Sequence, residues 1–230
     1  MKVLTVLGVD LASARWQDNG VAKLTFRVDG DGAAWVGARL GASRPTGAVT
    51  ATKVAQWIDS LARGSSAAVS LDGPQGWRSP TTPVSARGVG RRSDLAARTQ
   101  GKCGVRGTCF PGTQLRWFTF SIEVFEHLLG LPGVRLANDI ETTSLSPLSD
   151  GYWLIESYPT SVWRTSGLAP LPGKSRATPE GTRAALTTLA TTYGFTVETS
   201  SDSLSHDDVQ ALAAALPAVA LLGGPAIAVP

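Results

Sequence analysis

Residues 3–10 read VLTVLGVD, an apolar run rich in β-branched side chains that ends in an aspartate. Such a run predicts a buried strand that carries Asp10 at its carboxyl end. Two more strands are predicted at 21–28 and 33–40, because turn residues separate them from each other and from the first strand. Three strands joined in this way form an antiparallel meander.

A helix and a second acidic strand follow the meander. Apolar side chains recur at helical spacing over residues 50–63, and Gly64 is typical of a helix end. Residues 67–71 form another apolar run, which Asp72 follows directly. A strand after a crossover helix normally lies parallel to its neighbour. The order β-β-β-α-β therefore places aspartates at the ends of the first and fourth strands.

The rest of the chain combines helices and short strands with a loop-rich segment. Residues 75–112 are rich in Gly, Pro, Ser and Arg, which indicates an insertion with one short helix over 93–99. The other elements that the pattern predicts are helices at 114–129, 178–193 and 205–216 and strands at 152–155, 195–198 and 226–229. We expect one α/β domain over residues 1–230, with a mixed sheet, flanking helices and the insertion.

The composition excludes several classes of protein. The net charge of +3 permits an anionic partner without requiring one. The two cysteines, Cys103 and Cys109, exclude a scaffold of several disulfides and a four-cysteine zinc site, and we expect reduced thiols. The apolar run at 211–229 contains Pro217 and a Gly-Gly turn, so we expect a helix end and no membrane span. These features predict a cytoplasmic protein.

Acidic residues recur at similar structural places. Asp10, Asp72 and Glu156 each follow an apolar strand, and the pair Asp207-Asp208 begins an apolar helix. Ligands of α/β sheets bind outside the carboxyl ends of the strands, so these acids are expected to converge. Buried carboxylates need a cationic partner, and Mg²⁺ prefers oxygen ligands. Two such ions would activate water and stabilise the leaving oxygen of a phosphodiester. The alternative at each position is a turn residue or a helix cap.

Several short motifs occur in a fixed order along nearly the whole chain. They are GVD at 8–10, LDGP at 71–74, RRSDLAAR at 91–98, IESYP at 155–159, DDVQALAAA at 207–215 and GPAIAVP at 224–230. Together with the β-β-β-α-β order they resemble the ribonuclease H-like fold and, more closely, the DUF429 family of predicted nucleases. The resemblance implies a metal-dependent nuclease that hydrolyses phosphodiester bonds of nucleic acid. It implies Mg²⁺ or Mn²⁺ held by Asp10, Asp72, Glu156 and Asp207, with Asp208 as the second choice for the last ligand.

Two positions depart from the pattern of that family. Ser93 stands where a cysteine is usual, and Gln210 stands where the closing helix commonly has a second acid. Gln210 coordinates a cation only weakly, through a neutral carbonyl. Either Asp207 or Asp208 must then supply the last ligand, and the register favours Asp207.

Basic residues concentrate in the insertion, with one acid among them. They are Arg78, Arg87, Arg91, Arg92, Arg98, Lys102 and Arg106. Guanidinium groups bind phosphate through paired hydrogen bonds, and Arg91 and Arg98 are spaced to share one helical face. We expect Arg91, Arg92 and Arg98 to bind a nucleic-acid backbone. The alternative is a solvated surface loop.

Two other functions stay open at this point. A phosphotransferase shares the core, but that class needs two copies of it and the chain is too short. A nucleic-acid-binding protein that has lost catalysis is the second, and Gln210 favours it. Among the remaining candidates, His206 would orient a water or act as an acid or base, and the alternative is a surface or cap residue at the start of a helix. The tryptophans that would stack on bases are Trp16, Trp77 and Trp117, and the alternative for each is packing in the core or at its rim. The sequence does not distinguish DNA from RNA.

Overall fold

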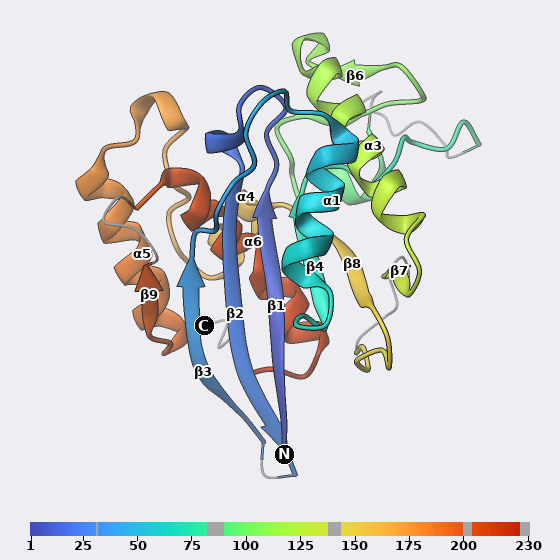
Figure 1. The fold of residues 1–230 in the computed structure, drawn as a ribbon. Helices are drawn as coiled ribbons and strands as arrows, with labels where there is room; N and C mark the ends of the chain where they lie inside the picture. The colour runs from blue at the N-terminus through green and yellow to red at the C-terminus, as the bar shows by residue number, and fades with distance from the viewer. Residues whose placement is uncertain (31, 82–89, 138–143, 200–203, 226–230) are drawn as a thin grey trace.

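A computed structural model describes residues 1–30, 32–81, 90–137, 144–199 and 204–225 of the chain (Figure 1). Within these ranges the chain forms a seven-stranded mixed sheet with helices on both faces, which confirms the predicted α/β class. The sheet strands are β1 (Lys2–Asp10), β2 (Gly20–Asp29), β3 (Gly32–Leu40), β4 (Ala68–Asp72), β7 (Val134–Leu136), β8 (Tyr152–Ser157) and β9 (Val197–Thr199). A separate small ribbon pairs β5 (Lys102–Cys103) with β6 (Cys109–Phe110).

The helices lie in the connections between these strands. They are α1 (Ala51–Ala62), α2 (Arg92–Ala96), α3 (Leu115–Leu129), α4 (Pro159–Thr165), α5 (Pro179–Tyr193) and α6 (His206–Leu221), with the 3-10 turns η1 (Trp16–Asp18), η2 (Gly112–Gln114) and η3 (Lys174–Arg176). Thr50, Thr178 and Ser205 cap α1, α5 and α6 by accepting a backbone N–H bond of the first turn.

The sheet order is β7-β8-β4-β1-β2-β3-β9. β1 pairs antiparallel with β2 and parallel with β4, and β4 pairs parallel with β8. The β-β-β-α-β order and its parallel pairing are therefore as predicted. The carboxyl ends of β1, β4 and β8 meet at one side of the sheet, which we call the carboxyl edge (Figure 1).

Two apolar layers cover the two faces of the sheet, and β1 contributes side chains to both of them. Val6 belongs to the layer that contains α4, α5 and α6, whereas Leu7 and Val9 belong to the layer that contains α1 and α3. This alternation is that of a strand buried on both faces. It also directs Asp10, four residues after Val6, toward the face that α6 covers.

The backbone of α6 lies directly on the sheet because two glycines leave room for it. A Cβ atom on Gly8 would lie 2.0 Å from the carbonyl oxygen of Ala211, and one on Gly20 would lie 1.9 Å from that of Asp207. Gly20 is also the register partner of Asp10. The close approach at Gly20 therefore brings the first turn of α6 to the carboxyl edge.

Substitution of Gly8 by alanine is expected to destabilise the protein. The added methyl group meets backbone atoms of α6, which cannot move away without displacing the helix, so we expect a loss of about 1–3 kcal/mol in the free energy of unfolding. Gly30→Ala is the matched control, since nothing lies within 4 Å of a Cβ there. Urea denaturation of the two variants measures the difference, and equal stabilities would contradict the close packing of α6.

Several predicted elements differ from the structure. α6 does not end before Pro217 but continues to Leu221, because burial against the sheet outweighs the cost of about 3 kcal/mol for an internal proline. The insertion helix is shorter than predicted, and Arg98, with a left-handed φ of 52°, lies beyond it. The strand expected at 226–229 lies outside the described residues. None of the helices described is long and apolar enough to cross a membrane.

Candidate active site

Asp10 and Asp72 lie side by side where β1 and β4 end. They are register partners in the parallel pairing, and both are partly buried. Hydrogen bonding with the Asp10 carboxyl lowers the pKa of Asp72, but larger effects oppose it. Burial and the charge of Glu156 raise the pKa of Asp72 to about 7. Burial, followed by the charges of Asp72 and Asp207, raises the pKa of Asp10 well above its usual range.

This aspartate pair has no ion-pair partner in the part of the chain that the structure describes. Lys174 lowers the pKa of Asp10 through its charge, but the opposing effects are larger. Among the described residues, no lysine or arginine forms a salt bridge with Asp10 or Asp72. Adjacent buried carboxyl groups of this kind fit a divalent cation with oxygen ligands, such as Mg²⁺ or Mn²⁺.

Ser157, rather than Glu156, continues the line of the two aspartates. In the register of β4 and β8, Asp72 is opposite Ser157 and Leu71 is opposite Glu156. Since side chains alternate along a strand, Glu156 is directed toward the other face. Ser157 is 6% exposed, and its hydroxyl oxygen has no hydrogen-bond partner among the described residues. A buried hydroxyl in this state fits a bound cation or a water molecule.

Glu156 is held by side chains of the insertion. Its carboxylate accepts hydrogen bonds from the Gln75 backbone N–H at 3.1 Å and from Arg91 Nη1 at 2.8 Å, and Arg91 Nη2 forms an ion pair with it. Arg91 also pairs with Asp94 at 2.6 Å, and Asp94 accepts the backbone N–H of Cys103 at 2.8 Å. Arg91 thus neutralises two carboxylates, and Glu156 is free to join a metal site only when Arg91 moves.

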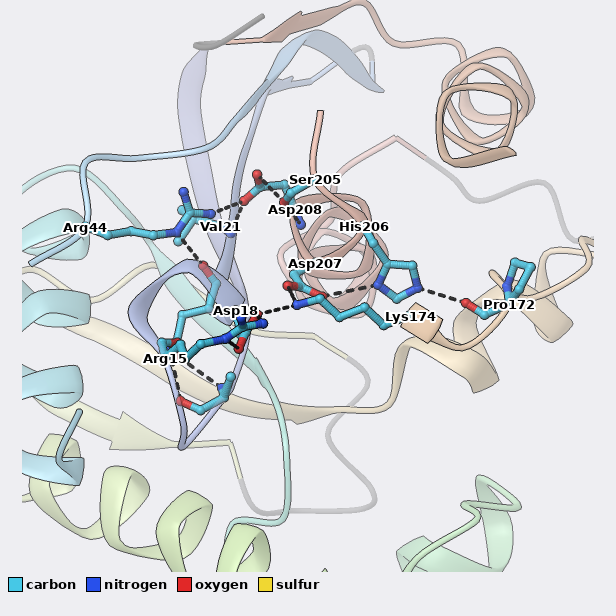
Figure 2. A network of polar contacts seen from close by, with 12 residues as sticks. Arg15, Asp18, Val21, Arg44, Pro172, Lys174, Ser205, His206, Asp207 and Asp208 are labelled. Atoms are coloured by element: carbon cyan, nitrogen blue, oxygen red, sulfur yellow. Dashed lines mark hydrogen bonds and ion pairs between the residues drawn. The ribbon is translucent and has the colours of Figure 1, made fainter. Parts of the chain in front are cut away.

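Asp207 lies at the start of α6, next to the side chains of Lys174 and His206 (Figure 2). Lys174 forms ion pairs with Asp207 and with Asp18, the latter at 2.6 Å. Burial lowers the pKa of Lys174, but its hydrogen bonds with Asp18 and Asp207 outweigh burial and raise it. His206 Nδ1 lies 3.2 Å from Asp207, and its Nε2 lies 2.9 Å from the carbonyl oxygen of Pro172. Lys174 is therefore the counter-ion of Asp207.

Asp208 faces away from Asp207 and has a structural role (Figure 2). Its Oδ1 accepts the backbone N–H of Val21 at 2.8 Å and a guanidinium N–H of Arg44 at 2.9 Å. Its Oδ2 accepts the hydroxyl of Ser205 at 2.6 Å, while its own N–H bonds to that hydroxyl oxygen. Both oxygens of Asp208 are therefore committed to joining α6, β2 and the loop after β3. Asp207 is the acid of α6 that remains a candidate ligand.

Removal of the Asp208 carboxylate is expected to destabilise the fold. Asp208→Ala leaves Arg44 and the Val21 N–H without their buried acceptor, so we expect a loss of about 3 kcal/mol or more. Asp18→Ala is the control from the same network, and its exposed partners predict a loss of about 1 kcal/mol or less. Thermal unfolding of both variants checks the order, and a harmless Asp208→Ala would contradict the structural role.

The arginines predicted to bind phosphate have different surroundings. Arg91 is mostly buried in its ion pairs, whereas Arg92 and Arg98 are exposed. The prediction that Arg91 and Arg98 share a helical face is wrong, because α2 ends at Ala96. Arg87 lies outside the described residues. Arg92 and Arg98 therefore remain available to a ligand near the carboxyl edge.

Gln210 and one of the tryptophans belong to the packing of the fold. Gln210 Oε1 accepts the indole N–H of the buried Trp163 at 3.0 Å, so the carbonyl that would coordinate a cation is used elsewhere. Trp16 is 3% exposed and packs against Trp57, so it is not available for stacking on a base. Trp77 and Trp117 are partly exposed. Cys103 and Cys109 are free thiols, as predicted.

The four predicted acidic ligands are only partly brought together. In the described ranges, no group of three or more His, Cys, Asp or Glu side chains is arranged to hold a metal ion. Asp10 and Asp72 are in contact, Asp207 influences Asp10, and Glu156 influences Asp72. The aspartate pair is thus the centre of the candidate site. Glu156 and Asp207 lie near it but form ion pairs with Arg91 and Lys174.

Several residues of the site were not identified from the sequence as parts of it. Lys174 lies in the 3-10 turn η3 and belongs to no motif, and nothing local indicates that it reaches Asp207. Asp94 follows Arg91 by three residues, which is the spacing of a capping box and was a usable signal. No protein-family model matches the sequence, and no curated protein matches it.

Proposed function

We propose that the protein is a metal-dependent nuclease that hydrolyses phosphodiester bonds of nucleic acid at the carboxyl edge. The observation that carries the proposal is the contact of Asp10 and Asp72, two buried carboxyl groups without an ion-pair partner among the described residues. The mixed sheet is compatible with the ribonuclease H-like fold that the sequence motifs resemble. The DUF429 resemblance is the second support, and it concerns the same acids.

Each group of the site has a place in this proposal. Asp10 and Asp72 would hold Mg²⁺ or Mn²⁺, which supplies an activated water and stabilises the charge on the leaving oxygen. Ser157 offers a neutral oxygen in line with them. Arg92 and Arg98 are exposed and would bind the phosphates that flank the cleaved bond.

The remaining acids require a rearrangement. Glu156 is paired with Arg91, and Asp207 is paired with Lys174. Binding of a divalent cation would weaken these pairs by competing for the carboxylates. A released Arg91 or Lys174 would then be free to contact a phosphate, so that a cation and an anionic substrate support each other's binding.

A binding protein without catalysis is the second candidate. The Arg91–Glu156 and Lys174–Asp207 ion pairs favour it, because they leave two of the four acids neutralised without any metal. In that case the exposed arginines bind nucleic acid, and the aspartate pair holds no cation.

One experiment separates the two candidates. Labelled single strands, duplexes, hybrids and branched junctions of DNA and RNA are incubated with the protein in Mg²⁺, in Mn²⁺ and in EDTA. The nuclease proposal predicts cleavage of at least one substrate with either metal and none in EDTA. Binding to the same substrates without cleavage in any condition would favour the binding protein.

A further inference from the structure

A pocket lies beside Asp72 on the side of Glu156, and the cation proposed for the aspartate pair would not fill it. Its volume is about 200 Å³, below the roughly 300–1,000 Å³ of pockets that hold whole drug-sized ligands. Asp72, Glu156, Trp117 and Tyr158 are among its lining residues. The space therefore suits one flat ring system directly next to the proposed cleavage site.

The aromatic side chains of this pocket are fixed in place before any ligand arrives. The Trp117 indole N–H donates to the carbonyl oxygen of Leu11 at 3.0 Å, and the Tyr158 hydroxyl accepts the backbone N–H of Gln100 at 3.2 Å. The indole N–H and one acceptor position of the phenol are thus already occupied. The Trp117 ring also packs T-shaped against Phe118, with the ring centroids 5.3 Å apart. Aromatic rings in a pocket wall act on a nucleobase by stacking.

One lining residue of the pocket has a buried polar atom without a partner among the described residues. Gln114 Oε1 is buried and has no hydrogen-bond partner among the described residues, and Gln114 lines the pocket. Buried polar atoms are normally paired, so this oxygen fits a ligand with a hydrogen-bond donor on its edge. A side-chain amide, with its acceptor beside its donor, matches the edge of a nucleobase.

The charges of the pocket oppose a phosphate. Three carboxyl groups line it, those of Asp72, Asp94 and Glu156, against one guanidinium, that of Arg91. A neutral ring is therefore favoured over an anionic group inside the pocket. Phosphates would stay outside, near the exposed arginines.

We propose that this pocket takes one unstacked nucleobase of the substrate, next to the phosphate that is cleaved. The inference rests on the proposed function and specifies its substrate class as single-stranded or locally unpaired nucleic acid. A base inside an intact duplex cannot enter, because its faces are stacked and its edge is paired. Trp117 and Gln114 become specificity residues for this base.

The test compares intact oligonucleotides with copies in which one base has been removed. Short labelled single strands, DNA and RNA, are titrated with the protein in Ca²⁺, which occupies oxygen sites, and the abasic position is moved along the strand. We expect one abasic position to weaken binding by about tenfold, the size of one lost stacking interaction. In Trp117→Ala and Gln114→Ala, intact and abasic strands should bind alike at that position.

The controls separate this inference from the proposed function. Gln56→Ala on the exposed side of α1 and Trp35→Ala in β3 remove the same residue types outside the pocket, and both should keep the preference for the intact strand. If the wild-type protein binds intact and abasic strands equally, or binds no strand at all, the proposed nucleobase pocket is contradicted. Cleavage in Mn²⁺ is measured in parallel. Cleavage without a preference for the intact strand supports the nuclease and contradicts the nucleobase pocket. A preference for the intact strand without cleavage supports the pocket and contradicts the nuclease.

Discussion

Replacement of Asp10 by asparagine is expected to reduce metal-dependent cleavage by about a thousandfold or more. The charges of Asp72, Asp207 and Asp208 all act on Asp10, which therefore lies within reach of the acids of both β4 and α6. Its loss removes an anionic ligand from the proposed cation site, and the cation contributes several kcal/mol to stabilising the transition state, about tenfold in rate for each 1.4 kcal/mol. Single-turnover cleavage in Mn²⁺ measures the effect.

The matched control for this variant is Glu123→Gln. Glu123 is exposed on α3, and its substitution makes the same change of carboxylate to amide away from the site. It should cleave as the wild type does. Asp10→Asn that retains wild-type activity would remove Asp10 from the mechanism.

Asp72→Asn is expected to stabilise the metal-free protein while it destroys the site. The pKa of Asp72 lies at about 7 in the folded protein and near 3.8 in the unfolded chain. The folded state therefore binds the proton more tightly, and the free energy of unfolding falls as the pH rises from about 4 to about 7. The loss above pH 7 is on the order of a few kcal/mol, and an amide at this position avoids it.

The measurement is denaturation in EDTA at pH 5 and pH 8. The wild type should be less stable at pH 8 than at pH 5, and this difference should be much smaller in Asp72→Asn. Mn²⁺ should raise the stability of the wild type at pH 8 but should not raise the stability of Asp72→Asn. Glu123→Gln again serves as the control, with the pH dependence of the wild type. If the wild type is equally stable at both pH values in EDTA, ionisation of the buried aspartate pair does not lower the free energy of unfolding, which contradicts this prediction.

The centre of the site could be predicted because its signals are local. Each of Asp10 and Asp72 directly follows an apolar run, and the order of helix and strands makes the two strands parallel. Glu156 was identified by the same rule, but β8 continues to Ser157, and this single residue moves Glu156 out of line. Strand ends are set by pairing with the neighbouring strand, which the sequence of one strand does not contain.

The partners of the acids could not be predicted from local patterns. Arg91 and Glu156 are 65 positions apart, and Lys174 and Asp207 are 33 apart, so only the folded chain brings each pair together. The length of α6 was misjudged for a related reason. Pro217 is unfavourable in an isolated helix, whereas packing on the sheet, made possible by Gly8 and Gly20, retains the helical turn around it.

The most direct measurement of the central claim is a calorimetric titration of the wild type, Asp10→Asn, Asp72→Asn and Glu123→Gln with Mn²⁺ at pH 8. If the aspartate pair holds the cation, the wild type and Glu123→Gln bind Mn²⁺ with release of protons, and both aspartate variants lose this binding. If the wild type binds no Mn²⁺, or if the aspartate variants bind it as tightly as the wild type, the carboxyl edge is not a metal site.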